Sequence, residues 1–245
     1  MDRVVVVTGG ARGIGKAMAM AFAKLNYKVV ICSRTKAELD EAEKEIGKNC
    51  SSFFCDVKFP DYVKRFFNFV IEKYGRVDVL INCAGILGPV GPLEKNDIGK
   101  WKDAIDINLM GTVNCVHEAI PIMKKQEFGR IVVMCGGGVG GKNIPPGFTA
   151  YTTSKFAIAG FTELVGKELK YFDIKINAIS PGAVNTKMAK ERWVDGGSPD
   201  RAVKLAVFLA TTKLDINGKV LSAKWDDYEH FKDKESLYTL RRIVD

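Results

Sequence analysis

This sequence of 245 residues has no long hydrophobic run, because Lys, Arg, Asp or Glu interrupts every apolar stretch. A helix needs about 20 apolar residues to cross a bilayer, so we expect neither a membrane span nor a membrane partner. The first apolar run, at residues 4–7, is too short for the core of a secretory signal and is followed by glycines. We therefore expect a cytoplasmic protein.

Ligand patterns for metals and disulfides are also scarce. The sequence contains only two histidines, and its six cysteines form no Cys-x-x-Cys pair. This arrangement argues against a zinc site and against a disulfide framework. Several of the cysteines fall inside apolar runs, where a free thiol behaves as a small hydrophobic side chain. We expect no metal site.

The formal net charge is +8, yet the sequence has no basic block with interleaved aromatic residues. Such a block would be typical of a nucleic-acid binder. The lysines are instead spread along amphipathic stretches, which favours a solvated surface or an anionic small ligand. We expect no nucleic-acid partner.

Apolar, β-branched runs alternate with helix-like stretches along the whole chain. Strands are predicted at 3–8, 28–32, 50–55, 77–82, 130–135, 174–180 and 218–222. Helices are predicted near 13–25, 35–47, 60–74, 97–124, 150–171 and 199–211. This rhythm predicts an α/β fold in one domain, 1–245: a doubly wound parallel sheet of about seven strands with helices on both faces. A charged, aromatic C-terminal tail is expected from about residue 223.

A glycine-rich segment, Thr8-Gly9-Gly10-Ala11-Arg12-Gly13-Ile14-Gly15, joins the first predicted strand to the first predicted helix. Glycine allows a sharp turn and lets a pyrophosphate approach the helix N-terminus, whose N–H groups and dipole favour anions. The glycines at 9, 13 and 15 do not follow the G-x-G-x-x-G spacing. The segment by itself could also be an ordinary turn.

The same segment resembles the cofactor loop of the short-chain dehydrogenase/reductase family, which implies a Rossmann fold and a nicotinamide dinucleotide. Further matches follow in the order and spacing of the family. They are Asp56-Val57, Asn82-Cys83-Ala84-Gly85, Asn108, Tyr151 with Lys155, and Pro181-Gly182 with Val184 and Thr186. The resemblance covers residues 3 to about 222. It implies that Asp56 and Val57 meet the adenine and that the segment 181–186 meets the nicotinamide end.

The residues after the second predicted strand indicate which dinucleotide binds. An acidic residue there accepts a hydrogen bond from the 2′-hydroxyl of NAD and repels a 2′-phosphate. Here Ser33 stands at that place, Arg34 follows, and Arg12 lies in the glycine loop. Two guanidinium groups can hold a phosphate, so NADP(H) is favoured over NAD(H). The alternative is that both arginines are ordinary surface charges.

The reacting pair is expected on one helix. A free tyrosine has a pKa of about 10, and a lysine four residues later lies on the same helical face, where it stabilises the phenolate. The family resemblance implies that Tyr151 exchanges the proton while the nicotinamide carries the hydride. It also implies that Lys155 holds the nicotinamide ribose and that Asn108 positions a water. We therefore expect an oxidoreductase that interconverts a carbonyl and an alcohol.

One position departs from the family, which places a serine after the fifth strand to polarise the substrate carbonyl. Counting from Gly129 puts Gly136 there, whereas counting back from Tyr151 gives Gly138. A shifted backbone could bring Cys135 into that role, although a thiol is a weak donor. The alternative function is therefore a dinucleotide-binding protein with lost or weak catalysis.

Two further features concern substrate and assembly. The segment Ser222-Ala223-Lys224-Trp225-Asp226 resembles the ending of a subgroup associated with saccharide-related clusters. The segment 186–199 is a candidate lid whose basic and aromatic residues suit an anionic or sugar-like substrate; they are Lys187, Lys190, Arg192 and Trp193. The long apolar helices, together with the family resemblance, predict a homodimer or homotetramer.

Overall fold

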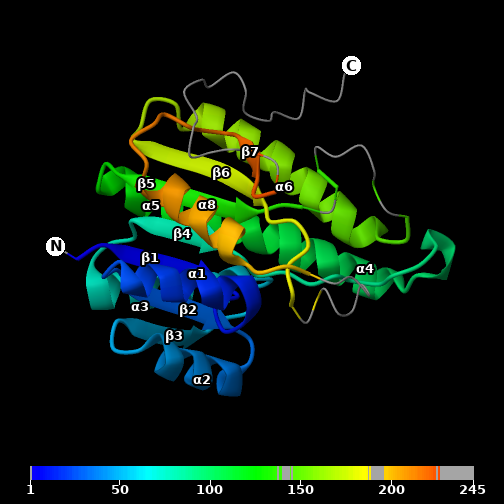
Figure 1. Cartoon of the computed structure of the whole chain (residues 1–245), viewed down its shortest axis with the longest axis horizontal. Coiled ribbons are helices and arrows are strands. Elements are labelled where there is room, and N and C mark those ends of the chain that lie inside the picture. Colours follow the sequence, from blue (N-terminus) through cyan, green and yellow to red (C-terminus); the bar gives the residue numbers. More distant parts are fainter. Residues whose placement is uncertain are drawn as a thin grey trace.

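The computed structural model describes residues 2–136, 138–139, 144, 146–186, 188, 196–224 and 226. Within them, seven parallel strands form one sheet in the order β3-β2-β1-β4-β5-β6-β7 (Figure 1). The strands are β1 (Val4–Thr8), β2 (Lys28–Ser33), β3 (Cys50–Phe54), β4 (Val79–Asn82), β5 (Gly129–Met134), β6 (Ile174–Ser180) and β7 (Val220–Ser222). The predicted doubly wound sheet is confirmed.

Helices cover both faces of this sheet. On one face lie α1 (Gly13–Lys24), α2 (Lys36–Ile46) and α8 (Asp200–Thr211). On the other lie α3 (Pro60–Tyr74), α5 (Gly111–Lys125) and α6 (Thr149–Glu168). A 3-10 turn, η1 (Leu93–Lys95), and the short helix α4 (Ile98–Ile105) follow β4. Each face has its own buried apolar cluster, as parallel sheets require.

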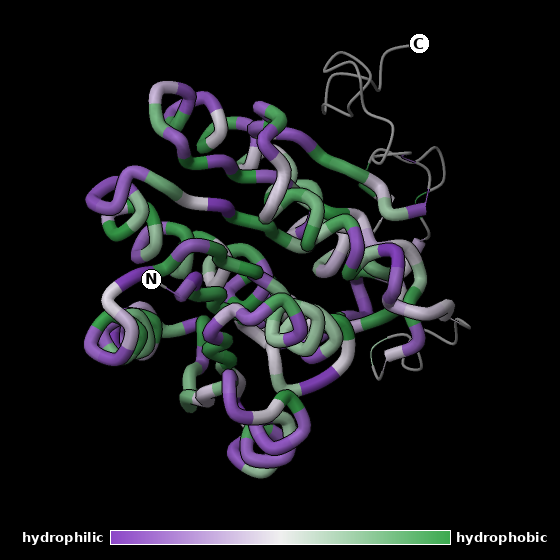
Figure 2. Tube along the Cα trace, turned by 60° about the vertical axis from the view of Figure 1, so that its left-hand side comes forward, coloured by the Kyte–Doolittle hydropathy of each residue, from purple (hydrophilic) through white to green (hydrophobic). Residues whose placement is uncertain are grey.

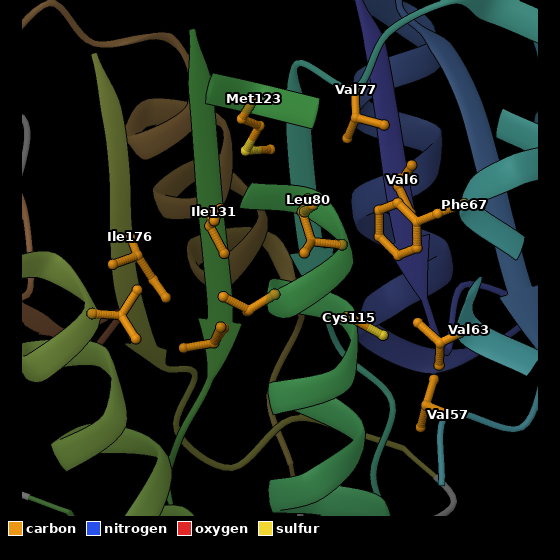
Figure 3. Packing of buried hydrophobic residues seen from close by; sticks show 14 of the residues in the cluster. Val6, Val57, Val63, Phe67, Val77, Leu80, Cys115, Met123, Ile131 and Ile176 are labelled. Atoms are coloured by element: carbon orange, nitrogen blue, oxygen red, sulfur yellow. The ribbon is translucent and has the colours of Figure 1, made fainter. Parts of the chain in front are cut away.

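Strands β1, β4, β5 and β7 are buried along their whole length because side chains on both faces pack under helices, whereas β3 becomes exposed at Phe54. In Figure 2 the hydrophobic segments lie inside and the hydrophilic ones lie mainly at the ends and outer turns. Figure 3 shows the cluster under α3 and α5, where residues of four neighbouring strands meet the helices. Val6, Leu80, Ile131 and Ile176 come from the sheet, and Val63, Phe67, Cys115 and Met123 come from the helices.

The helix predicted near 97–124 is present, with a π-helical turn in it that was not predicted. The stretch 97–124 is not a continuous α-helix, because α4 and α5 are separated by the π-helical turn η2 (Asp106–Met110). At the start of α5, Gly111 packs so closely on Val57 that an added side-chain carbon would overlap it. Wide π turns interrupt α-helices frequently at functional sites, and Asn108 lies within this one.

The order of the strands fixes where a ligand can bind. The chain starts at β1, winds outward to β3, and then returns to β4 on the other side of β1. Ligands of such sheets bind beyond the carboxyl ends of the strands at this reversal point. The glycine loop after β1 and the segment 83–86 after β4 meet there. Among the described helices, none has both the length and the apolar character to cross a bilayer.

We expect Leu80→Ala to lower the free energy of unfolding by about 2–5 kcal/mol, because it opens a cavity in the sheet core. Leu80 has no exposed surface, whereas Leu214, in the loop before β7, is 45% exposed. Leu214→Ala is the matched control, with an expected loss below about 1 kcal/mol. Urea denaturation followed by circular dichroism measures both, and equal losses would contradict the assignment of Leu80 to the core.

Candidate active site

A cleft of about 660 Å³ runs beyond the carboxyl ends of the strands, from the end of β2 to the N-terminal part of α6. Most of the residues predicted from the sequence line it. They are Gly9, Arg12, Gly13, Ile14, Gly15, Ser33, Arg34, Val57, Ala84, Gly85, Cys135, Tyr151, Lys155, Pro181 and Thr186. The predicted residues that do not line it are Asp56, Asn82, Asn108, Gly182 and Val184. Its size is typical of a small-molecule site.

The glycine loop has no room for side chains. Gly9 has a φ of 64°, and a side-chain carbon there would come within 2.9 Å of the Ala84 backbone. At Gly15 such a carbon would overlap the carbonyl oxygen of Gly9. The N-cap residue of α1 is Arg12, whose side chain makes no capping hydrogen bond. The N-terminus of α1 can therefore bind an anion such as a pyrophosphate through its first N–H groups.

Thr8 anchors this loop to the segment after β4, a role that the sequence analysis did not assign. Its hydroxyl oxygen accepts hydrogen bonds from the N–H groups of Cys83 and Ala84, both at 3.1 Å. It also donates to the Asn82 Oδ1 atom at 3.1 Å. The Asn82 Nδ2 atom donates to the Thr112 carbonyl at 3.3 Å. The side chain of Asn82 thus supports the cleft from behind.

Tyr151 and Lys155 lie on α6, one turn apart, and both are buried. The Lys155 Nζ atom lies 5.5 Å from the centre of the Tyr151 ring and donates to the Met134 carbonyl at 2.8 Å. Burial lowers the pKa of Lys155, while the neighbouring thiols Cys135 and Cys83 act in the opposite direction. The helix therefore presents a phenol and an amine together to the cleft.

Asn108 lies behind this pair, and both polar atoms of its side-chain amide make hydrogen bonds. Its Oδ1 atom accepts from the Ile86 N–H at 2.8 Å, and its Nδ2 atom donates to the Ile86 carbonyl at 2.9 Å. The Nδ2 atom also donates to the Ser154 hydroxyl at 3.0 Å. Ser154 in turn donates to the Tyr151 carbonyl at 2.6 Å. The sequence did not predict this role of Ser154, although its position between Tyr151 and Lys155 places it in the predicted site.

The structure also shows what faces the Tyr151 hydroxyl from β5. Gly136 has a φ of 123°, and a side-chain carbon on it would lie 3.9 Å from the Tyr151 hydroxyl oxygen. Gly138 does not line the cleft. Cys135 does, but its side chain is 1% exposed and burial raises its pKa to about 12. Of the two glycines considered for the serine position, Gly136 is therefore the one that lies beside the Tyr151 hydroxyl.

At the opposite end of the cleft, each predicted phosphate-binding arginine has an acidic neighbour. Arg12 pairs with Glu38 of α2 at 3.2 Å. Arg34 pairs with Asp56 at 3.6 Å. The Ser33 hydroxyl accepts a long hydrogen bond from the Thr35 N–H at 3.4 Å. Sequence analysis missed Glu38, because nothing in the spacing from residue 12 to residue 38 indicates that the two side chains meet.

The remainder of the cleft includes Asn185 and Met188. The basic and aromatic lid residues Lys187, Lys190, Arg192 and Trp193 lie outside the described residues, and so does Trp225. Ser222 and Asp226 of the subgroup-like ending form a turn in which the Ser222 N–H donates to the Asp226 carboxylate at 2.6 Å. No group of His, Cys, Asp and Glu side chains suited to a metal occurs within the described ranges.

A doubly wound parallel sheet with a glycine loop at its reversal point defines an α/β fold of the dinucleotide-binding type. The chain belongs to the short-chain dehydrogenase family, whose family model, described as short chain dehydrogenase, matches residues 3–195. The chain is therefore an oxidoreductase. Members of this family bind nicotinamide dinucleotides.

Curated relatives agree with this assignment. A 3-oxoacyl-(acyl-carrier-protein) reductase of Thermotoga maritima is 32% identical over 237 residues, covering 89% of this chain and 95% of the relative. The short-chain reductase protein NovJ of Streptomyces niveus is 35% identical over 193 residues, covering 78% of this chain and 72% of the relative.

Solved structures share the fold. A variant of actinorhodin polyketide ketoreductase with NADPH has a TM-score of 0.85 and 27% identity, covering 90% of this chain and 95% of that protein. An NAD+-bound xylitol dehydrogenase has a TM-score of 0.83 and 26% identity, covering 90% and 96%. The fold thus accommodates both dinucleotides.

We expect Gly15→Ala to weaken dinucleotide binding at least tenfold, because the added methyl group would overlap the Gly9 carbonyl in the loop. Titration of the reduced cofactor by fluorescence measures the affinity. Gly99→Ala is the control, since Gly99 is exposed in α4 and its added carbon meets only the Asp97 carboxylate. Unchanged cofactor affinity in Gly15→Ala would contradict a cofactor role for the loop.

Proposed function

We propose that the chain is an NADP(H)-dependent oxidoreductase that interconverts a carbonyl and an alcohol, with Tyr151 as the general acid and base. The observation that carries the proposal is the common cleft. The glycine loop lines one part of it, and the phenol of Tyr151 lines another part together with the buried amine of Lys155. When bound, the nicotinamide supplies the hydride chemistry.

Tyr151 is the proton carrier in this proposal. Its hydroxyl gives a proton to the substrate oxygen during reduction and takes one during oxidation. The charged form of Lys155 stabilises the phenolate that remains, because an opposite charge nearby favours the ionised form. The Lys155 amine uses one donor on the Met134 carbonyl, which leaves further N–H groups for the hydroxyls of a nicotinamide ribose.

Asn108 acts here as a positioning residue. Its amide is committed to Ile86 and Ser154, so its side chain is better suited to hold α6 than to bind the water expected from the family. The chain of contacts from Asn108 through Ser154 ends at the Tyr151 backbone. It fixes the start of α6 relative to the segment after β4, and therefore fixes the phenol.

The preference for NADP(H) rests on the adenine end of the cleft. Ser33 lines it where NAD enzymes have an acid, and the guanidinium groups of Arg12 and Arg34 line it as well. A 2′-phosphate carries negative charge that Arg binds well. The NADPH named with the actinorhodin ketoreductase structure agrees with this choice, whereas the NAD+ of xylitol dehydrogenase shows that the fold does not dictate it.

We expect Tyr151→Phe to lower kcat by at least a hundredfold while the affinity for NADPH changes less than about threefold, because only the proton carrier is lost. Absorbance of the reduced cofactor at a saturating carbonyl substrate gives kcat, and fluorescence titration gives the affinity. A Tyr151→Phe protein with undiminished turnover would remove Tyr151 from the reaction.

We expect Ser33→Asp to shift the affinity ratio of NADPH to NADH toward NADH by at least tenfold, because the new carboxylate repels a 2′-phosphate and accepts the 2′-hydroxyl. Both affinities are measured by fluorescence titration, with Ser33→Asn as the uncharged control. An unchanged ratio in Ser33→Asp would place the 2′ group of the cofactor elsewhere.

A second candidate function, a dinucleotide-binding protein with weak catalysis, is favoured by Gly136. No side chain extends from this position toward the Tyr151 hydroxyl. Loss of an oxyanion-type donor costs about a hundredfold or more in rate. Binding of NADPH without turnover of any aldehyde, ketone or sugar alcohol, in both the unmodified protein and Cys135→Ala, would support this candidate.

We also propose that residues 1–245 act as one domain and that the chain assembles into a homodimer or homotetramer. The exposed apolar side chains of Leu164 on α6, at 61%, and Met110 next to α5, at 43%, support assembly. The tail expected from about residue 223 lies mostly outside the described residues. The substrate stays a small carbonyl or alcohol compound, and the cytoplasmic location stays a prediction.

A further inference from the structure

We propose that Glu38 limits the preference for NADP(H) over NAD(H), because its carboxylate competes with the 2′-phosphate for Arg12. This inference rests on the proposed function and names a specificity-determining residue for it. Arg12 is the N-cap of α1 and Glu38 lies in the first turn of α2, so their ion pair joins two helices across the end of the cleft.

Both partners face the ligand space. Arg12 and Glu38 line the cleft together with Ser33, Arg34 and Thr35, the residues that follow β2. The Arg12 Nη1 atom lies 3.2 Å from the Glu38 Oε1 atom, and the two side chains are 55% and 34% exposed. Such a partly exposed ion pair is weak, so a ligand can displace it.

Arg34, the second arginine at this end of the cleft, is also paired with a carboxylate. Arg34 pairs with Asp56 at 3.6 Å, and the Asp56 side chain is only 19% exposed. A phosphate at this end therefore meets two cations that already have carboxylate partners. To use Arg12, it must separate that side chain from Glu38 and then lie beside a carboxylate of its own sign.

NAD(H) meets the opposite situation. Its 2′-hydroxyl carries no charge and can donate a hydrogen bond to a carboxylate, because an ionised carboxylate is a hydrogen-bond acceptor. Among the described residues that line this end of the cleft, Glu38 is the acidic one. It comes from α2 rather than from the end of β2. Specificity is the difference between two affinities. Glu38 lowers the affinity for NADP(H) and does not lower that for NAD(H), so it reduces the preference for NADP(H).

The test compares Glu38→Gln with Glu45→Gln. Glu45 pairs with Lys16 at 2.8 Å, so this second ion pair also joins α2 to α1, but neither residue lines the cleft. We expect Glu38→Gln to bind NADPH about threefold to tenfold more tightly, with NADH unchanged or weaker. Glu45→Gln should keep both affinities within about twofold. Fluorescence titration of the full chain at fixed ionic strength measures all of them.

Adenosine 2′,5′-bisphosphate and adenosine 5′-monophosphate separate this effect from the reacting end of the cleft. We expect Glu38→Gln to tighten binding of the bisphosphate and to leave the monophosphate unchanged, as measured by calorimetry. In an Arg12→Gln background the gain for the bisphosphate should shrink, because the two substitutions act on one interaction. A gain of equal size in both backgrounds would overturn competition for Arg12.

Two other results would also overturn the inference. One is an NADPH-to-NADH affinity ratio that stays within twofold of the unmodified protein in Glu38→Gln. The other is an equal change in both affinities, which would make Glu38 a structural residue only. If cofactors bind as expected but no carbonyl or alcohol is turned over, the proposed catalysis fails, whereas the proposed cofactor preference and this inference stand. If neither cofactor binds, both fail.

Discussion

The end of the cleft that holds Tyr151 and Lys155 depends on one buried amide. Asn108 makes three side-chain hydrogen bonds, which join the π-helical turn η2, the segment after β4 and helix α6. A buried amide that loses a partner costs free energy, so the three segments can only adopt this arrangement together. The place of Tyr151, the approach of Gly85 to the Lys155 amine and the course of the chain at Ile86 all follow from it.

The strands and helices could be predicted from the sequence because parallel strands are buried on both faces and read as continuous apolar runs. The predicted ends differ from the observed ones by only a few residues, as at β4 (77 against 79) and α6 (171 against 168). The turn η2 could not be predicted, because a single wide turn leaves the apolar spacing of 97–124 almost unchanged. It matters nonetheless, since it carries Asn108.

For the site, the order of the motifs was sufficient to bring most predicted residues into one cleft, because the topology places the carboxyl ends of all strands at one edge. Pairing of distant side chains was not predictable. Thr8 meets Asn82 and Arg12 meets Glu38 only because neighbouring strands and helices adopt a particular register. The position of Gly136 beside the Tyr151 hydroxyl likewise depends on the direction of the backbone after β5.

The charges along the cleft are arranged asymmetrically. At the end of the cleft near β2, Arg12 and Arg34 each have a carboxylate partner. At the reacting end, the amine of Lys155 contacts a carbonyl and is flanked by two thiols, and burial raises the pKa of Cys83 to about 11 and of Cys135 to about 12. Those thiols are neutral at pH 7, and no described cleft-lining side chain beside the amine is a carboxylate. In the mechanism that we propose, the charged form of Lys155 favours the phenolate of Tyr151, which accepts a proton from an alcohol, whereas burial lowers the pKa of Lys155 and opposes that charge.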